Sequence, residues 1–413
     1  MNIEIIPHTL VGSVDAVASK SHGHRLLIAA ALSQKPTNVT INTSSQDIEA
    51  TQNCLEQLDA PMPVLDCGES GSTLRFLLPV AMALKDQALF MGSGRLPKRP
   101  ISPLKEEMEA HGCVFSNEHR KKGDAQEICH VKGRLKGGIF TLPGNVSSQY
   151  ITGLLFALPL LKENSQIRVT SPLESKRYVD LTVDVMQKCN IEVYVEEKEG
   201  LLTYKVQGKQ RYLPPAEMTA EGDWSNIAFW VAAGILSKES GVICRGLNLQ
   251  SIQADREIIN ISLRMGGKVL EKYTSLLAME APLKGIHIDV SGIPDLVPIL
   301  AVMAAAAKGT THIHNAARLR LKESDRLAAM YDCLSRLGAD IIEEPGGLTI
   351  TGGKQLSGGT VSGYNDHRIV MAMTIASILC DKPLIIEGAE AVNKSYPRFF
   401  EDFEWLGGEY RVL

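Results

Sequence analysis

Six segments of the chain have the pattern of helices that are apolar on nearly every side, and they limit the possible folds more than any other feature. They are 22–33, 71–84, 147–161, 223–236, 293–307 and 365–379. A helix that is apolar all round must be buried all round. A chain of 413 residues, 44% of them hydrophobic, is also too long for one ordinary core and suits two domains of roughly 200 residues each. We therefore expect two cores, each built around three of these helices.

A second pattern lies between the apolar segments: an amphipathic helix, a residue that tolerates the left-handed conformation, and a short run with strand character. The turn residues are Asp59, Gly112, Asn190, Gly266, Gly338 and Gly407, and these residue types accept a positive φ at the end of a helix. Their spacing of about 50 to 80 residues is longer than that of a solenoid repeat. Strand signals fill the gaps, at 39–41, 139–142, 167–170, 204–207, 286–290 and 348–351.

The two patterns together predict six similar units, each with one exposed helix, one buried helix and several strands. Three units in each half of the chain would give two similar α/β domains. Because glycine after a helix is common, six weak matches could also arise in an unrelated α/β chain, and this alternative stays open.

Charge and cysteine usage argue against several classes of protein. The formal net charge is -4, so the overall field favours neither nucleic acid nor an anionic membrane surface, and any anion site must be local. The eight cysteines are scattered without a C-x-x-C pair, which predicts reduced, mostly buried thiols and no zinc site. The N-terminus lacks a signal-peptide pattern, and the apolar helices stop short of the roughly 18 residues that a membrane span requires. We expect a soluble, cytoplasmic protein.

The most unusual polar residues stand at the starts of the apolar segments. A helix N-terminus offers unpaired N–H groups and a partial positive charge, so hydroxyl and cationic residues there favour a phosphate site. Several such ends that point the same way would form an anion site. The residues are Ser19-Lys20-Ser21 with Arg25, Glu69-Ser70-Gly71-Ser72 with Arg75, Asn145 with Ser147-Ser148-Gln149, Ile293-Pro294-Asp295, and Asn365-Asp366-His367-Arg368.

These residues also have a purely structural interpretation. Ser147 or Ser72 could be an N-cap without a ligand, and Arg25 and Arg75 could be solvated surface groups. Both arginines, however, are surrounded in the sequence by apolar residues, where an unpaired guanidinium is costly. We therefore expect both to be anion ligands.

Two further stretches concentrate charge. Residues 94–100 place three cations, Arg95, Lys98 and Arg99, in a loop bounded by prolines, and 320–326 interleave acidic and basic residues at a helix start. The second stretch could equally be an ordinary salt-bridged helix face. No P-loop is present in the sequence, which argues against kinase-type use of a nucleotide. The glycines of 346–359 have hairpin spacing and are interpreted as structural.

These motifs resemble those of the 5-enolpyruvylshikimate-3-phosphate (EPSP) synthase family over most of the chain, from near Lys20 to Lys394. The matching residues are Ser-Lys-Ser with Arg25, Gly-Glu-Ser-Gly-Ser-Thr-Leu-Arg at 68–75, Arg95 before Lys-Arg-Pro, Ser147-Ser148-Gln149, Ser175-Lys176-Arg177-Tyr178, Ile293-Pro294-Asp295, Lys322-Glu323-Ser324-Asp325-Arg326, Asn365-Asp366-His367-Arg368 and Lys394.

The resemblance implies an α/β fold of two similar globular domains, each with three βαβαββ units around buried parallel helices, the inside-out α/β barrel of enolpyruvyl transferases. It also implies that the chain crosses between the domains twice. Residues 1–19 would then join 224–413 in a discontinuous domain, and 20–223 would form the inserted domain.

The resemblance also implies a set of ligands for two substrates. Shikimate 3-phosphate would contact Lys20, Ser21, Arg25, Ser147, Ser148, Gln149, Ser175, Tyr178, Asp295 and Lys322. Phosphoenolpyruvate would contact Lys20, Gly71, Arg75, Arg95, Gln149, Glu323, Arg326, His367, Arg368 and Lys394.

Catalysis needs a base for the 5-hydroxyl of shikimate 3-phosphate and an acid for the methylene carbon of phosphoenolpyruvate. By the resemblance, Asp295 would be the base and Glu323 the main proton donor, with Lys20 assisting both. Arg326 and Arg368 would pair with the carboxylate of phosphoenolpyruvate, and Arg75, Arg95 and Lys394 would hold its other end. No metal or organic cofactor is implied, and we expect a monomer.

Two departures from the family pattern bear on details of contact: Arg318 stands where some members have Asn, and Glu69 stands where many have Asn. In this family glyphosate competes with phosphoenolpyruvate beside the glycine at position 71. Because that glycine has no Cβ, it leaves room for an inhibitor slightly longer than the substrate. We therefore expect the enzyme to be sensitive to glyphosate.

Two other functions remain as alternatives. The sister transferase that acts on UDP-N-acetylglucosamine usually has Lys-Asn where Lys20-Ser21 stands here, and often a cysteine near the position of Arg95. No cysteine occurs in 91–105, which argues against it. A non-catalytic binder of phosphorylated small molecules would have anion sites but no use for Asp295 and Glu323 as a base and an acid.

Overall fold

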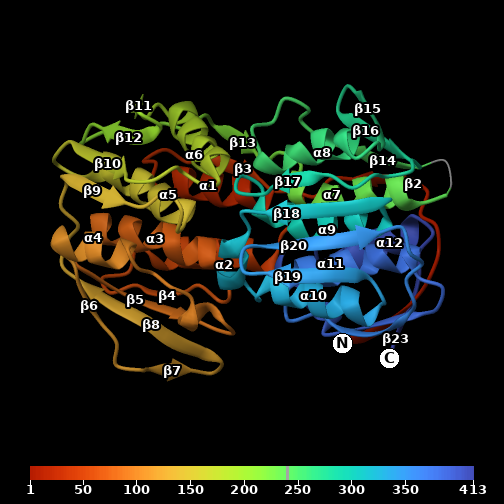
Figure 1. Cartoon of the computed structure of the whole chain (residues 1–413). Coiled ribbons are helices and arrows are strands. Elements are labelled where there is room, and N and C mark those ends of the chain that lie inside the picture. Colours follow the sequence, from red (N-terminus) through yellow and green to blue (C-terminus); the bar gives the residue numbers. More distant parts are fainter. Residues whose placement is uncertain (239–240) are drawn as a thin grey trace. The chain divides into compact units, whose positions relative to one another are not determined.

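The chain forms two compact units in the structure, a computed structural model that describes residues 1–238 and 241–413 (Figure 1). The inserted unit is Lys20–Ala220, and the flanking unit consists of Met1–Ser19 and Glu221–Leu413. The chain therefore leaves the flanking unit after Ser19 and returns to it at Glu221.

The inserted unit contains two larger sheets and one strand pair. One sheet has the order β4 (Val64–Asp66), β5 (Gln87–Gly92), β8 (Ala125–Lys132), β6 (Val114–Ser116), with β7 (Lys121–Lys122) on β8. The second has the order β11 (Val193–Lys198), β12 (Leu201–Val206), β10 (Ser165–Val169), β9 (Ile139–Leu142), and β13 (Glu217–Thr219) pairs with β3 (Asn38–Thr40). The helices are α1 (Lys20–Ala31), α2 (Gln46–Gln57), α3 (Gly71–Leu84), α4 (Leu104–Ala110), α5 (Ser148–Ala157) and α6 (Lys176–Lys188), with short 3-10 helices η1 (Leu96–Lys98) and η2 (Leu158–Leu160).

The flanking unit contains three four-stranded sheets. The first has the order β15 (Lys268–Lys272), β16 (Ser275–Met279), β14 (Val242–Arg245), β2 (Gly12–Asp15). The second has the order β17 (His287–Asp289), β18 (Gly309–His314), β20 (Gly347–Gly352), β19 (Asp340–Glu344). The third has the order β21 (Gly359–Ser362), β22 (Leu384–Glu387), β1 (Asn2–Ile6), β23 (Glu409–Val412). The helices are α7 (Trp224–Leu236), α8 (Ile258–Arg264), α9 (Val297–Ala306), α10 (Arg326–Arg336), α11 (His367–Ala376) and α12 (Phe399–Trp405), with 3-10 helices η3 (Ala254–Glu257), η4 (Pro294–Leu296), η5 (Ala317–Leu321), η6 (Ser377–Leu379) and η7 (Ala389–Lys394).

One connection recurs through both units. Two parallel strands are joined by a buried helix, as in β9–α5–β10 and β17–α9–β18, and an exposed helix then leads to an antiparallel pair. Parallel strands need such a crossover because a short turn cannot reverse the chain twice. Over 139–206 and over 287–352 the element order is therefore the predicted βαβαββ.

The six apolar segments form the buried helices, as predicted. α3 has the predicted bounds 71–84, α7 begins one residue later than predicted, and η4 and η6 extend α9 and α11 to fill the segments 293–307 and 365–379. In the flanking unit α7, α9 and α11 contact one another, and Figure 1 shows them one below another with β18 and β20 drawn across them.

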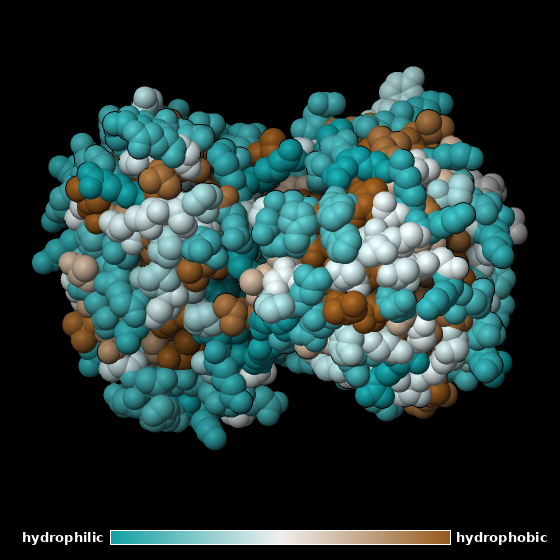
Figure 2. All heavy atoms as spheres, in the orientation of Figure 1, coloured by the Kyte–Doolittle hydropathy of each residue, from teal (hydrophilic) through white to brown (hydrophobic). Residues whose placement is uncertain are grey.

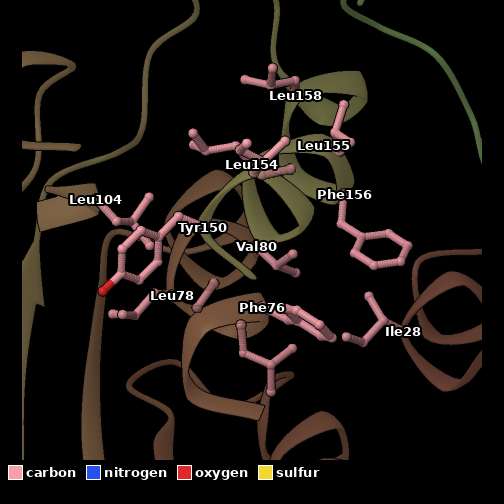
Figure 3. Packing of buried hydrophobic residues seen from close by; sticks show 14 of the residues in the cluster. Ile28, Phe76, Leu78, Val80, Leu104, Tyr150, Leu154, Leu155, Phe156 and Leu158 are labelled. Atoms are coloured by element: carbon pink, nitrogen blue, oxygen red, sulfur yellow. The ribbon is translucent and has the colours of Figure 1, made fainter. Parts of the chain in front are cut away.

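The core of the inserted unit is formed by α1, α3 and α5. Figure 3 shows Ile28, Phe76 and Phe156 together on one side, with Val80 and Leu154 between these helices. All five side chains are at most 1% exposed. Burying one such side chain stabilises the fold by roughly 1.5 to 3 kcal/mol.

The crossing of α3 and α5 depends on Gly153 and positions the starts of both helices. A Cβ at this position would lie 2.2 Å from the Arg75 carbonyl oxygen and 3.0 Å from Pro79 Cγ. Only glycine therefore lets α5 approach the backbone of α3 this closely. As a result, the first turns of α3 and α5, which carry several of the predicted site residues, are held next to each other.

The predicted turns between exposed helices and strands are confirmed at five of the six positions. Gly112, Asn190, Gly266, Gly338 and Gly407 all have φ between 61° and 97°. In each, the amide one residue further on donates to a carbonyl five residues back, as in Ala339 N to Leu334 O at 3.0 Å, which is the bond expected when a left-handed residue ends a helix.

The prediction was wrong at Asp59, which does not have a positive φ. There the link from α2 to β4 covers 58–63, longer than the three or four residues of the other five turns, and contains Pro61 and Pro63. A longer link reverses the chain without a left-handed residue.

The surface and the thiols agree with the composition. On the face drawn in Figure 2, small groups of hydrophobic residues lie among hydrophilic ones in both units, as is usual for a folded protein. All eight cysteines are buried and unpaired, as predicted. Among the helices of the described ranges, none has both the length and the apolar character needed to cross a membrane.

Candidate active site

The predicted site residues fall into two clusters, one in each unit, and each cluster gathers at helix starts. The inserted cluster lies at the N-termini of α1, α3, α5 and α6. The flanking cluster lies at η4, at the starts of α10 and α11, and at the end of η7.

Gln149 links α3 and α5 in the inserted cluster. Its Nε2 donates to Ser72 Oγ at 2.9 Å, and its Oε1 accepts from Arg75 Nη1 at 2.7 Å. Arg75 Nη2 also donates to the Pro100 carbonyl at 3.0 Å, and its guanidinium lies 5.7 Å from the ring centre of Tyr150. The structure therefore brings together the predicted phosphoenolpyruvate ligands Arg75, Gln149 and Gly71.

Arg25 is buried and tied to α6. Its Nε donates to Thr182 Oγ1 at 2.9 Å, its Nη2 to the Tyr178 carbonyl at 2.8 Å, and its Nη1 to the Ser21 carbonyl at 2.5 Å. Burial lowers the pKa of the Arg25 guanidinium to about 9, so it stays cationic near neutral pH. The neutral oxygens around it satisfy its donors without cancelling its charge.

Two more predicted shikimate 3-phosphate ligands have unusual surroundings. Ser175 is 3% exposed and stands before α6 with φ 55°, in the left-handed region. This conformation costs a serine about 1 kcal/mol, and such outliers gather at functional sites. Lys20 Nζ donates to Asp47 Oδ2 at 2.7 Å, and both side chains are largely buried.

Of the two serines that the sequence offered as simple N-caps, one is a cap. Ser147 accepts a hydrogen bond from Gln149 N at 3.3 Å at the start of α5. In α3 the cap is Ser70, which accepts from Thr73 N at 3.2 Å. Ser72 lies in the first turn of α3 instead, and its hydroxyl accepts the hydrogen bond from Gln149 Nε2.

The flanking cluster is organised by Arg326, which is 1% exposed. Its Nη1 donates to Asp295 Oδ1 at 2.7 Å and its Nη2 to Glu323 Oε2 at 2.9 Å. Its Nε donates to Asp366 Oδ2 at 2.8 Å, and Nη2 also reaches Asp366 Oδ1 at 3.2 Å. One guanidinium thus fixes the positions of the predicted base and the predicted proton donor.

Asp295 lies among several cations. Arg368 Nη2 is 3.3 Å from its Oδ2, and Lys322 Nζ is 3.6 Å from its Oδ1. Burial disfavours the ionised carboxyl, but Arg368, Lys322 and Arg326 outweigh it and hold the pKa of Asp295 well below its usual value. Asp295 is therefore a carboxylate at neutral pH, as a base must be.

The start of α11 completes the flanking cluster. Asp366 caps the helix by accepting from Arg368 N at 3.0 Å, and His367 is 1% exposed beside it. Lys394 is 5% exposed, and its Nζ donates to the Asn365 carbonyl at 2.7 Å. The predicted residues His367, Arg368 and Lys394 therefore lie near the same helix end.

The charged stretch 320–326 forms two separate groups of ion pairs, one partly exposed and one in the flanking cluster. Arg320 pairs with Asp325 at 3.0 Å and with Glu343 at 2.6 Å, both partly exposed, which is the salt-bridged surface that the sequence allowed. Lys322, Glu323 and Arg326 belong instead to the buried cluster.

Sequence reasoning gave no role to three groups that hold the site together: Asp366, Asp47 and Thr182. An Asp directly before His-Arg at a helix start was a usable cap signal for Asp366. Asp47 and Thr182 meet their partners only through tertiary packing. Among the residues that the structure covers, no group of three or more His, Cys, Asp or Glu side chains is placed to hold a metal ion.

Known proteins are similar to this chain over nearly its whole length. A family model described as EPSP synthase (3-phosphoshikimate 1-carboxyvinyltransferase) matches residues 5–403. Proteins called 3-phosphoshikimate 1-carboxyvinyltransferase from Clostridium acetobutylicum and Clostridium kluyveri are each 41% identical to this chain, over 98% of it and 97% of their own length.

Two solved structures share the fold. An EPSP synthase from Acinetobacter baumannii has a TM-score of 0.79 at 23% identity, with all of both chains covered. The enolpyruvyl transferase NikO from Streptomyces tendae has a TM-score of 0.76 at 17% identity, over 99% of this chain and 98% of its own. They confirm the predicted enolpyruvyl transferase fold. Since the family model covers nearly the whole chain and the Clostridium proteins are 41% identical to it, the chain belongs to the EPSP synthase (3-phosphoshikimate 1-carboxyvinyltransferase) family.

Proposed function

We propose that this chain transfers the carboxyvinyl group of phosphoenolpyruvate to the 5-hydroxyl of shikimate 3-phosphate, giving 5-enolpyruvylshikimate 3-phosphate and inorganic phosphate. The hydroxyl oxygen bonds to C2 of phosphoenolpyruvate while C3 takes up a proton. The tetrahedral intermediate then loses phosphate from C2 and a proton from C3. No bond to the protein forms at any stage, and no cofactor takes part in the proposed mechanism.

The observation that carries this proposal is the pairing of Asp295 and Glu323 on the two ends of one guanidinium. Asp295 is ionised and accepts the proton of the 5-hydroxyl, and Glu323 delivers a proton to C3. Removing a positioned acid or base typically lowers the reaction rate by roughly 100- to 10,000-fold. Because Arg326 binds both carboxyl groups, it holds the acid and the base at a fixed separation.

The remaining ligands divide by substrate. Ser21, Arg25, Ser147, Ser148, Ser175 and Tyr178, with Asp295 and Lys322, hold shikimate 3-phosphate, and Lys20 and Gln149 contact both substrates. Gly71, Arg75, Arg95, Glu323, His367, Arg368 and Lys394 contact phosphoenolpyruvate. Lys20 also assists the departure of phosphate. The hydroxyl-rich helix starts suit phosphate oxygens, and the arginines suit planar or tetrahedral anions.

Arg326 has a different role in this proposal from the bidentate carboxylate ligand expected from the resemblance. Four hydrogen bonds to Asp295, Glu323 and Asp366 occupy its Nε and both Nη atoms. The carboxylate of phosphoenolpyruvate would have to replace Asp295 or Glu323 to form two bonds with it. Arg368 is therefore the principal carboxylate ligand, and Arg326 contributes at most a single hydrogen bond.

A phosphate-release assay with the purified chain tests the function. We expect phosphate only when phosphoenolpyruvate and shikimate 3-phosphate are both present, together with an equal amount of enolpyruvyl product detected by mass spectrometry. Release with UDP-N-acetylglucosamine in place of shikimate 3-phosphate would contradict the substrate assignment. Binding of both ligands without release would identify a non-catalytic binder. We further propose a monomeric, cytoplasmic enzyme, and sedimentation at assay concentration tests the first of these.

A further inference from the structure

Two histidines lie side by side on the outer face of the sheet that contains β17 and β18, and neither belongs to the clusters of site residues. His287 on β17 is opposite His312 on β18 in the parallel register. The next residues along the strands, Ile288 and Ile313, are at most 2% exposed, and side chains alternate between the two faces of a strand. Both histidines therefore stand on the outer face, where their rings stack with centres 4.5 Å apart and planes 24° apart.

Hydrogen bonds determine which nitrogen of His312 carries the proton. Thr349 Oγ1 lies 2.9 Å from His312 Nδ1, and the same hydroxyl donates to Glu344 Oε1 at 2.6 Å. A carboxylate only accepts hydrogen bonds, so the hydroxyl proton points to Glu344 and Thr349 Oγ1 accepts from His312 Nδ1. A neutral imidazole with a proton on Nδ1 has its lone pair on Nε2. A histidine whose second nitrogen is held in this way is typical of metal ligands.

His287 supplies a second imidazole at a suitable distance. A transition-metal ion lies about 2.0 to 2.1 Å from each imidazole nitrogen, so two nitrogens on one tetrahedral ion are about 3.3 Å apart. The stacked rings are close enough for this separation, but an ion cannot lie in two nearly parallel ring planes at once. Because His287 is exposed, its ring can turn about the Cβ–Cγ bond within picoseconds to nanoseconds. Such a turn lets both rings point a nitrogen at one ion.

The chemistry of the pair selects the kind of ion. Imidazole nitrogens suit zinc, copper and nickel, whereas magnesium and calcium prefer oxygen ligands. Within the described ranges, no third His, Cys, Asp or Glu side chain completes a group with this pair, which leaves the other coordination positions to water. The scattered cysteines predicted no zinc site in the sequence. The two histidines come from different strands, and only the pairing of β17 with β18 brings them together.

We propose that His287 and His312 form a surface site for a divalent transition-metal ion such as Zn²⁺, with Thr349 and Glu344 as positioning residues. The ion takes no part in the proposed reaction. It bridges two neighbouring strands of the flanking unit, β17 and β18, whose histidines are held next to each other only in the folded chain. An ion that binds the folded state in preference to the unfolded state stabilises the protein.

Calorimetric titration of the untagged full chain with zinc chloride tests the site without turnover. We expect one ion per chain and a higher unfolding temperature, and magnesium chloride should give neither effect. His287→Ala and His312→Ala should each remove both effects, because a single imidazole remains. His8→Ala is the matched control, since His8 is an exposed histidine of the same unit. It should bind zinc as the wild type does.

Two substitutions at Thr349 test the positioning role. Thr349→Val keeps the branched shape but removes the hydroxyl that orients His312, so zinc affinity should fall about 10-fold or more, the scale of a lost partner behind a metal ligand. Thr349→Ser keeps the hydroxyl and should bind zinc as the wild type does. Equal affinities of the two variants would contradict the role of Thr349.

A wild-type chain that binds no zinc would overturn the inference. So would wild-type affinity in both histidine variants, because the protein would then hold an adventitious ion only, at some other place. An equal loss of binding in His8→Ala would also overturn it, since any exposed histidine would then act in the same way. Circular dichroism checks that the variants fold, and His287→Ala, at an exposed position, decides the matter if His312→Ala does not fold.

Discussion

The buried arginines of the two clusters are held in opposite ways. Arg25 in the inserted unit is surrounded by hydroxyl and carbonyl oxygens, whereas Arg326 in the flanking unit is surrounded by three carboxylates. Neutral partners satisfy the donors of a guanidinium but leave its charge to act on a ligand. Carboxylates neutralise it and become fixed in turn.

This difference suggests a division of labour between the units. In the proposed function the positive charge of Arg25 in the inserted unit is available for binding an anion, although Lys20 of the same unit pairs with Asp47. In the proposed mechanism, Arg326 of the flanking unit positions the acidic groups that transfer protons. Substitutions at Asp366, Asp295, Asp255 and Gly71 test this difference between the units.

The largest effect is expected from Asp366→Ala. Asp366 is fully buried and accepts hydrogen bonds from Arg326, Ser324 and the start of α11. Removing one partner of a buried ion pair costs about 3 to 5 kcal/mol. Thr182→Val removes a neutral partner of Arg25 and should cost only about 1 kcal/mol. Urea unfolding of both variants measures the difference, and equal losses would show that the two arginines are not held in different ways.

The second effect concerns turnover. Asp295→Asn keeps the shape of the side chain but cannot accept the hydroxyl proton, so kcat should fall by at least about 100-fold, or roughly 2.7 kcal/mol in activation free energy. Circular dichroism should match the wild type. Asp289→Asn, an exposed acid on β17, is the control and should keep normal turnover. Near-normal activity in Asp295→Asn would remove Asp295 from the role of base.

The third prediction concerns the pH dependence of stability and tests whether the buried Asp255 of the flanking unit is ionised as Asp295 is. Asp255 accepts a hydrogen bond from Ser225, and burial together with Asp295 raises its pKa to about 6, against the opposing effect of Arg368. In the unfolded chain the pKa is about 3.9. Between these values the folded state holds a proton that the unfolded state has lost, so stability should fall as pH rises from about 4 to about 6.

Asparagine resembles the protonated carboxyl, so Asp255→Asn should lack this fall. The difference in unfolding free energy between variant and wild type should therefore grow by on the order of 2 kcal/mol across that window. Urea unfolding at several pH values measures it. A constant difference would mean that Asp255 is ionised in the folded protein like Asp295.

The buried helices were predictable from sequence because a helix that is buried on all sides consists almost entirely of apolar residues. The segment 71–84 became α3 without change, although Pro79 lies inside it, since the apolar pattern outweighs one residue of low propensity. Asp59 was not predictable: aspartate tolerates a positive φ, but the length of the link to β4 removed the need for it.

The site was predictable wherever a residue belongs to a motif, and not where its partner is distant in sequence. The motif residues Gln149 and Arg75 meet across 74 positions of the sequence, and Arg25 and Thr182 meet across 157. Arg99 was visible as one of three cations in a loop. In the structure its Nη1 lies 2.8 Å from where a Cβ on Gly71 would be, a position that depends on the packing of 94–100 against α3 and α5. Sequence supplied the chemical groups, and packing decided which of them are neutralised.

The smallest effect is expected from Gly71→Ala, which tests the binding side of the comparison. The added methyl group would lie 2.8 Å from Nη1 of both Arg75 and Arg99, so the flexible ends of these side chains must move. This differs from the reason expected from the family, in which the methyl group clashes with the inhibitor itself. A small overpacking of this kind costs about 1 to 2 kcal/mol, or roughly 5- to 30-fold in binding.

Both explanations predict weaker glyphosate inhibition in Gly71→Ala, but they differ for the substrate. If the two guanidinium groups are displaced, the KM for phosphoenolpyruvate must rise as well, because Arg75 is one of its proposed ligands. A direct clash with the longer inhibitor would leave that KM nearly unchanged. Inhibition curves at matched phosphoenolpyruvate concentrations, with Gly346→Ala as a control whose Cβ meets nothing closer than 3.8 Å, separate the two. Equal inhibition constants for wild type and Gly71→Ala would show that Gly71 does not line the inhibitor site, and Arg75, whose guanidinium lies over Gly71, would then have to be placed away from phosphoenolpyruvate too.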